Sequence, residues 1–243
     1  MKQTRLIMGM PITIEVVGLR DPKVLKKVFD YFREVDARFS PYKSDSELSA
    51  VNNGLDPDGW SEDMKLVMRL CEETKQASGG YFDINRGGYI DPSGLVKGWS
   101  IANAAELLKD SGYNNFYIEA GGDIQAEGLS ETNEPWTIGI RSPFDINKIV
   151  KVIKTTGVGV ATSGKYLRGD HIYNPLDNYS SPDEVSSLTV MAPNIFEADR
   201  FATAAYAMGK VGAVFLSALP GFDVYQIDNQ GQALFTPGIE AAC

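Results

Sequence analysis

Two oxygen-bearing side chains stand four residues apart near the end of the chain. They are Asp199 and Thr203, in the run Glu197-Ala-Asp-Arg-Phe-Ala-Thr-Ala204. The run predicts a helix, in which residues four apart lie on one face, one turn from each other. A carboxylate and a hydroxyl on a rigid helix suit a hard cation such as Mg2+, which takes few protein ligands and shares itself with phosphates. A solvated helix face is the commoner explanation of such a pair. Other residues of the chain are therefore needed to support a metal site.

The chain has a single histidine, His171, in the polar run Gly169-Asp-His-Ile-Tyr-Asn-Pro175. Imidazole is the one unperturbed side chain that can act as a base near neutral pH, so His171 is a candidate for proton transfer. A structural histidine is the commoner alternative.

Two glycine-containing segments are candidates for binding a phosphate. The run Asp91-Pro-Ser-Gly-Leu-Val-Lys-Gly98 lets the backbone approach a ligand, and Lys97 supplies positive charge. Paired glycines in Glu119-Ala-Gly-Gly-Asp123 allow a bulge or close ligand contact between two strands. A capped turn and a plain hairpin are the respective alternatives. Aromatic residues adjoin these loops and either stack on a planar ring or cover the core: Tyr42, Tyr81, Phe82, Trp99 and Tyr173.

The composition restricts the partners of this protein. With 243 residues and a formal charge of −9, its composition argues against a nucleic-acid partner, which would require a basic surface. An acidic protein that binds a phosphate needs local positive charge from a metal, a lysine or backbone N–H groups. Cys71 and Cys243 do not form a disulfide framework. No signal peptide is visible, so we expect a cytoplasmic protein as written, or a periplasmic or membrane-anchored one if a leader has been removed.

The chemistry-bearing residues must be positioned by short strands and a few helices. Alternating apolar runs predict strands over 8–17, 115–120, 123–126, 136–141, 157–163, 187–192, 222–227 and 232–235. Capping residues and periodicity predict helices over 21–39, 61–78, 99–110 and 211–219. A short helix that ends at residue 51 and a helix around Asp199 are also expected, and residues 90–98 are expected to form a tight loop. The expected fold is α+β, a single domain over 1–243 of mostly antiparallel sheet with flanking helices.

Eight motifs occur in an order that resembles the ApbE family, the FAD:protein FMN transferases once labelled thiamine-biosynthesis lipoproteins. The resemblance extends over roughly residues 8 to 210. The motifs are Met8-Gly, Ser40-Pro-Tyr-Lys, Tyr81-Phe-Asp-Ile, Asp91-Pro-Ser-Gly-Leu-Val-Lys-Gly-Trp, Glu119-Ala-Gly-Gly-Asp-Ile, Ala161-Thr-Ser-Gly, His171-Ile-Tyr-Asn-Pro and Glu197-Ala-Asp-Arg-Phe-Ala-Thr-Ala.

The resemblance implies a T-fold-like domain that binds FAD and Mg2+ and moves FMN onto a Ser or Thr hydroxyl of an acceptor protein, releasing AMP. It assigns Mg2+ to Asp199, Thr203 and a main-chain oxygen at Gly94, and gives His171 and Asp199 catalytic roles, with His171 beside the scissile phosphate. The FAD contacts that it implies are Met8, Tyr42, Tyr81, Phe82, Asp83, Asp91, Lys97, Glu119 and Tyr173. The acceptor would carry Asp-x-x-Ser/Thr-Gly-Ala-Ser/Thr, as in subunits of membrane redox complexes; this chain has no such run.

The chain departs from the family pattern in ways that leave alternatives open. Ala202 stands where the family often has a second acid, which predicts a weaker metal site. The segment between Ile84 and Asp91 is short, and Asn174-Pro-Leu-Asp-Asn178 replaces the usual Asp-Pro-x-Thr-Gly. With water as the nucleophile, the same site would be an FAD pyrophosphatase that gives FMN and AMP. A non-catalytic FAD-binding or storage protein is the third alternative, and a homodimer is left open.

Overall fold

The structure is a computed structural model that describes residues 1–165, 172–177 and 182–242. Its main sheet has the strand order β1-β2-β5-β6-β9-β10-β11-β12, and each neighbouring pair is antiparallel. The strands are β1 Lys2–Ile7, β2 Met10–Val16, β5 Phe116–Ala120, β6 Asp123–Glu127, β9 Gly157–Gly164, β10 Val185–Ala192, β11 Asp223–Asp228 and β12 Ala233–Phe235. The expectation of an α+β fold with a mostly antiparallel sheet is confirmed.

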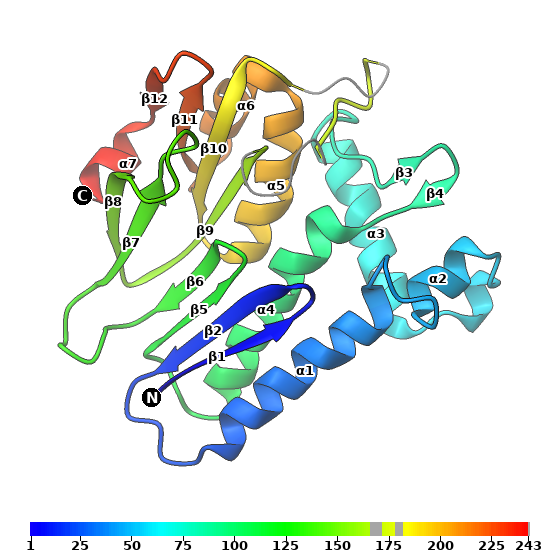
Figure 1. Cartoon of the computed structure of the whole chain (residues 1–243), viewed down its shortest axis with the longest axis horizontal. Helices are drawn as coiled ribbons and strands as arrows, with labels where there is room; N and C mark the ends of the chain where they lie inside the picture. Colours follow the sequence, from blue (N-terminus) through cyan, green and yellow to red (C-terminus); the bar gives the residue numbers. More distant parts are fainter. Residues whose placement is uncertain (166–171, 178–181, 243) are drawn as a thin grey trace.

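The sheet is assembled from two similar halves (Figure 1). In the first, the pair β1–β2 is followed by helices and then by the hairpin β5–β6; in the second, β9–β10 is followed by helices and then by β11–β12. The helices of the first half are α1 Lys23–Phe39, α2 Glu47–Asn52, α3 Glu62–Ala77 and α4 Ser93–Asp110. Those of the second are α5 Ile195–Ala207, α6 Gly212–Ser217 and the terminal α7 Pro237–Ala241.

Smaller elements complete the chain. A two-stranded ribbon, β3 Asn85–Arg86 and β4 Tyr89–Ile90, precedes α4, and a second ribbon, β7 Trp136–Arg141 and β8 Ile149–Thr155, joins the halves of the sheet. Single 3-10 turns lie at Pro57–Gly59 and Gly209–Val211. No helix in the described ranges is long and apolar enough to cross a membrane.

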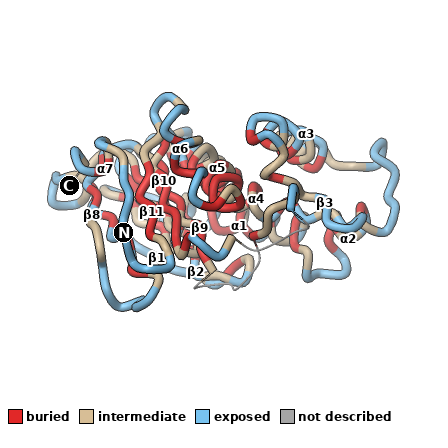
Figure 2. Tube along the Cα trace, turned by 90° about the horizontal axis from the view of Figure 1, so that it is seen from above, coloured by how far each residue is buried: buried red, intermediate tan, exposed pale blue. Residues whose placement is uncertain are grey.

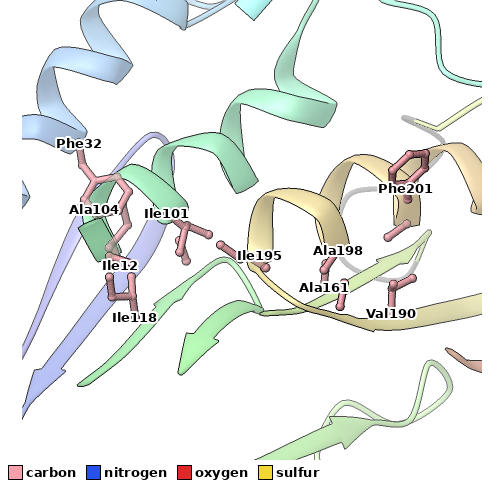
Figure 3. Close-up of a cluster of buried hydrophobic side chains, with 14 of the residues drawn as sticks. Ile12, Phe32, Ile101, Ala104, Ile118, Ala161, Val190, Ile195, Ala198 and Phe201 are labelled. Carbon is pink, nitrogen blue, oxygen red and sulfur yellow. The ribbon is translucent and has the colours of Figure 1, made fainter. Parts of the chain in front are cut away.

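The core lies between one face of the main sheet and the helices α1, α4, α5 and α6. Figure 3 shows side chains of this layer, with Ile12 and Ile118 of the sheet beneath Ile101 of α4, and Ala161 and Val190 beneath α5. Figure 2 shows the buried segments concentrated where the sheet meets α4 and α5. A second apolar cluster joins α2 and α3 to the ends of α1 and α4, and a third lies under the β7–β8 ribbon on the other sheet face.

Helix α4 corrects the largest error of the sequence analysis, which placed residues 90–98 in a loop. The helix begins at Ser93, whose N–H donates to Asp91 Oδ1 at 3.0 Å. The glycines that suggested a loop instead allow α4 and α5 to cross closely. A Cβ on Gly98 would lie 2.6 Å from the Cβ of Asp199 and 2.9 Å from the carbonyl oxygen of Ile195.

Other differences concern short elements. The strand expected over 8–17 is preceded by a partner, β1, and Met8 and Gly9 form the turn between them with φ of 56° and 71°. Strands β1, β3, β4 and β8 and helix α7 were not expected from the sequence, and the helix expected over 211–219 is the shorter α6. Helix α3 begins as predicted, because the Ser61 hydroxyl accepts the Met64 N–H at 3.2 Å. The hairpin across Gly121-Gly122 is also confirmed.

Candidate active site

Two hollows meet on the molecule and together hold most of the predicted site residues. The first, named here the inner cavity, has a volume of about 380 Å³. Its walls are the β3–β4 ribbon, the first two turns of α4, the end of β9 and one face of α5. The second, the outer groove, measures about 1340 Å³ and extends from the β1–β2 turn to β7. Both are lined by Asp91, Ser93, Lys97, Gly121 and Thr162, so the two hollows are continuous there.

The three oxygen donors predicted for Mg2+ lie where α4 and α5 cross. The Gly98 N–H donates to Asp199 Oδ2 at 2.7 Å, and the Thr203 hydroxyl donates to the carbonyl oxygen of Gly94 at 3.3 Å. Gly94, Asp199 and Thr203 all line the inner cavity. The four-residue spacing on α5 therefore matches the four-residue spacing of the glycines on α4, and the crossing brings the donors to one wall.

A buried carboxylate that the sequence analysis did not single out completes the site. Asp123, the first residue of β6, forms a close ion pair with the Lys97 ammonium, and its Oδ1 accepts the Thr162 N–H at 3.1 Å. The same ammonium lies 3.4 Å from Asp199 Oδ1. The side chains of Asp123 and Asp199 are 1% and 4% exposed. An acid directly after Gly121-Gly122, at the start of a strand that is otherwise buried, was the signal that could have identified Asp123.

The charges of this cluster do not balance. Two carboxylates against one ammonium leave a formal charge of −1 in a nearly dry site. Burial raises the pKa of Asp199 above its ordinary value, and the nearby Asp123 raises it further, while Lys97 opposes both. Oδ2 of Asp123 has no hydrogen-bond partner beyond the ion pair. An additional cation would therefore stabilise the cluster.

The donor chemistry fits Mg2+. In the described part of the chain, no three or more His, Cys, Asp or Glu side chains gather as a metal cluster. The candidate set is instead one carboxylate, one hydroxyl and one carbonyl, which is the sparse all-oxygen type that Mg2+ completes with water and phosphate oxygens. These residues would be Asp199, Thr203 and Gly94.

The residues predicted to contact FAD are divided between the two hollows. Tyr81, Phe82, Asp83 and Tyr173 line the inner cavity; Met8, Tyr42 and Glu119 line the outer groove; Asp91 and Lys97 line both. His171 lies outside the described residues, so its role stays a prediction, although its neighbour Ile172 lines the inner cavity.

Some of these residues also have structural roles. Asp83 accepts the Lys75 ammonium at 2.7 Å and the Asn85 N–H at 2.9 Å, and its carbonyl oxygen accepts the Tyr173 hydroxyl at 3.1 Å. Glu119 accepts the Gly122 N–H at 2.8 Å, which stabilises the β5–β6 turn. Backbone geometry around the hollows therefore depends on the same side chains.

The structure shows the surroundings of two positions at which the sequence differs from the family pattern. Ala202 is fully buried in the main core and lines neither hollow, so an acid there would face apolar side chains rather than the donors. The structure therefore places Ala202 away from the predicted donors, and the affinity of this site for a metal ion stays a prediction. The short segment between Ile84 and Asp91 forms the β3–β4 ribbon, whose Arg86 and Tyr89 line the inner cavity. The Arg86 guanidinium lies 4.8 Å from the centre of the Tyr173 ring.

Comparisons with known proteins agree with this architecture. A sequence model of the ApbE family matches residues 8–89 and 85–225. An FAD:protein FMN transferase of Vibrio cholerae is 32% identical over 81% of this chain and 77% of its own length. Relatives of the same name from Haemophilus influenzae and Escherichia coli are 30% and 27% identical, and the matches span less than half of their length.

Solved structures show the same fold. The flavin transferase ApbE from Vibrio cholerae superposes with a TM-score of 0.87 at 22% identity, covering 100% of this chain and 99% of its own. An ApbE protein from Thermotoga maritima gives 0.86 at 19% identity, covering 100% and 98%. The family match extends over most of the described elements, including both helices of the crossing. By sequence and by fold, the chain belongs to the ApbE family.

Proposed function

We propose that this protein is a Mg2+-dependent FAD:protein FMN transferase, which moves FMN from FAD to a Ser or Thr hydroxyl of an acceptor protein and releases AMP. The names of its relatives support the reaction class. The observation that carries the proposal for this chain is the position of the donor set. Asp199, Thr203 and Gly94 lie in the inner cavity beside Lys97, where that cavity joins the outer groove.

This arrangement fits a dinucleotide. One nucleotide half would lie in each hollow, with the pyrophosphate at the junction. The N-terminus of α4 lies at the junction of the two hollows. Its N–H groups and the helix dipole favour an anion, as does the Lys97 ammonium. The side chains of the Lys97, Asp123 and Asp199 cluster carry a formal charge of −1, so the phosphates would need the Mg2+ as well as Lys97 and the backbone N–H groups.

The reaction requires one bond to form and one to break at the FMN phosphorus. The acceptor hydroxyl oxygen bonds to phosphorus, the anhydride bond to AMP breaks, and the hydroxyl proton leaves to a base. His171 is the predicted base, a role worth about 10²–10⁴ in rate. Asp199, Thr203 and Gly94 would hold the Mg2+, which supplies Lewis-acid polarisation of a phosphoryl oxygen. Lys97 and the start of α4 orient the phosphates, and positioning of this kind dominates phosphoryl transfer.

Water in place of the acceptor hydroxyl would make the same site an FAD pyrophosphatase, and we propose this as a side activity. A non-catalytic FAD-binding or storage protein is the remaining alternative. The sequence feature that favours it is Ala202, which is buried in the core and lines neither hollow.

One assay separates the three functions. The protein is incubated with FAD, Mg2+ and a peptide that contains Asp-x-x-Ser/Thr-Gly-Ala-Ser/Thr, and the products are analysed by mass spectrometry. Covalent FMN on the peptide with free AMP supports the transferase, AMP with free FMN supports the hydrolase, and intact FAD supports a storage protein. In Asp199→Ala, Mg2+-dependent turnover should disappear while the circular dichroism spectrum is kept. Normal turnover of this variant would contradict the assigned role.

A further inference from the structure

The Lys97 ammonium is placed between two buried carboxylates, but not symmetrically. It forms the closer ion pair with Asp123 and lies 3.4 Å from Asp199 Oδ1. The Lys97 side chain is 15% exposed, so the ammonium is largely removed from water as well. In such a site a buried charge left without a partner is costly, so the choice of acid with which the Lys97 ammonium pairs affects both carboxylates.

Asp123 is held rigidly from the opposite side of the site. It begins β6 directly after the Gly121-Gly122 turn, and its Oδ1 accepts the Thr162 N–H from the neighbouring strand β9 at 3.1 Å. Its Oδ2 makes no hydrogen bond in the described part of the chain and faces the ammonium. The sheet therefore presents one free carboxylate oxygen to Lys97, while Asp199 approaches from α5.

Asp199 has a different task if the proposed function is correct. One of its oxygens accepts the Gly98 N–H, and the other, Oδ1, is the oxygen nearest to Lys97. An ammonium bound tightly to Oδ1 would compete with a metal ion for that oxygen. Without Asp123, Asp199 is the adjacent acid to which the ammonium would move.

We propose that Asp123 is a positioning residue that draws the Lys97 ammonium away from Asp199 and leaves the Asp199 carboxylate available to a divalent cation. The inference rests on the proposed function, because that function requires a cation at Asp199. It assigns Asp123 no contact with the cation itself. It also explains how a cation site can contain a lysine: the second carboxylate balances the ammonium and holds it in place, where its remaining N–H groups can donate to the phosphates.

The first experiment is a double-mutant cycle read by calorimetric titration of Mg2+ and Mn2+ into the protein without FAD. Asp123→Asn should lower the cation affinity roughly 10–100-fold, the usual cost of losing a partner behind a metal ligand. Lys97→Met removes a like charge beside the proposed cation and should raise the affinity in both backgrounds, but by at least about tenfold more in the Asp123→Asn background, because coupled residues are non-additive. Equal effects in both backgrounds, or undiminished affinity in Asp123→Asn, would overturn the proposal.

A matched control separates this role from a merely structural one. Ser187→Ala removes another buried polar group of the same sheet whose hydroxyl has no hydrogen-bond partner in the described residues. It should leave the cation affinity unchanged, and urea unfolding of each variant should show that all of them are folded. A loss of affinity in Ser187→Ala equal to that in Asp123→Asn would mean that Asp123 acts only through general stability.

The second experiment does not depend on the metal. In a crystal structure of Asp123→Asn grown without divalent cations, the Lys97 ammonium should lie closer to Asp199 Oδ1 than the present 3.4 Å, and closer to Asp199 than to residue 123. An ammonium that stays beside residue 123 would overturn the inference even if the transferase assay succeeds. If the wild-type protein binds no cation while Lys97 moves as expected, the metal part of the proposed function fails, and with it the claim that Asp123 serves a cation.

Discussion

The Thr203 side chain contributes both an oxygen atom and a methyl group to the crossing of α4 and α5. Its hydroxyl is positioned by α5 and by the carbonyl oxygen of Gly94, 3.3 Å away, while its methyl group faces the surface of α4 at Gly94. A threonine therefore does two things at this position: it fills the space at the helix crossing and offers an oxygen to the cavity.

Replacing Thr203 tests the oxygen separately from the packing. Thr203→Val keeps the shape and removes the hydroxyl, so we expect the Mg2+-dependent turnover of FAD to fall. Loss of a residue that only supports a metal ligand costs roughly 10–100-fold, and loss of a ligand should cost at least as much. Thr203→Ser keeps the hydroxyl and should retain most of the turnover. Initial rates of AMP release over a range of Mg2+ concentrations measure both, and equal rates in the two variants would contradict the ligand role.

Cys71 offers a chemical probe of the folded state. It is 2% exposed on α3, and burial, assisted by the negative charge of Asp91, raises the pKa of its thiol to about 12. At pH 8 only about one thiol in 10⁴ would then be ionised, and the thiolate is the reactive form.

We therefore expect iodoacetamide to leave Cys71 unmodified in the native protein at pH 8 and to modify it fully in denaturant. Mass spectrometry of the peptide that contains Cys71 gives the extent of reaction. Rapid modification under native conditions would show that α3 does not stay packed against the second apolar cluster.

At the scale of elements, the crossing of α4 and α5 determines whether the donors meet. Gly98 and Gly94 are its two close contacts, but they are not equally tight. A Cβ on Gly98 would lie 2.6 Å from the Cβ of Asp199 and 2.9 Å from a backbone oxygen, whereas a Cβ on Gly94 would lie 3.2 Å from the Thr203 methyl group. The first contact requires the helices to separate; the second can be relieved by a small shift of a side chain.

The two alanine substitutions should therefore behave differently. Gly98→Ala should destabilise the fold by about 1–3 kcal/mol through overpacking, despite the roughly 1 kcal/mol that alanine gains in helix propensity. Gly94→Ala should change the free energy of unfolding by less than about 1 kcal/mol but lower the Mg2+ affinity, because Thr203 must move. Urea unfolding and calorimetry distinguish them, and equal destabilisation by both would contradict the crossing geometry.

The same crossing explains what the sequence could and could not predict. The strands with regular alternation, such as β7, and the helices with clear caps, such as α3, were found because local chemistry determines them. The start of α4 was missed because its glycines serve a contact with a helix a hundred residues away, which no local pattern reveals. Asp123 was missed for a similar reason: its position after Gly121-Gly122 was a signal, but its partner Lys97 comes from another element and no local pattern connects the two.

At the scale of the molecule, the site is shared by both halves of the sheet. The first half supplies Gly94, Lys97 and Asp123, and the second supplies Asp199 and Thr203, with Thr162 at the end of β9. A ligand that contacts both halves should therefore stabilise the whole fold rather than one part of it.

Thermal unfolding measures this linkage. FAD alone at about 100 times its dissociation constant should add about 2.7 kcal/mol, which for a chain of this size corresponds to an increase in Tm of roughly 5–11 °C. Mg2+ at about 100 times its own dissociation constant should add a further increment of similar size. In Asp199→Asn, we expect the increment due to Mg2+ to disappear while FAD alone still raises the Tm. An unchanged Mg2+ increment in that variant would place the cation elsewhere.

The order of the elements along the chain also has a consequence for biosynthesis. Lys97 and Asp123 are translated well before Asp199 and Thr203, and a domain generally folds as a unit. While the ribosome is still completing α5, the nascent polypeptide contains the lysine and the acid of β6 but not yet the whole donor set. The proposed cation site can therefore form only after the second half of the sheet and α5 have been synthesised.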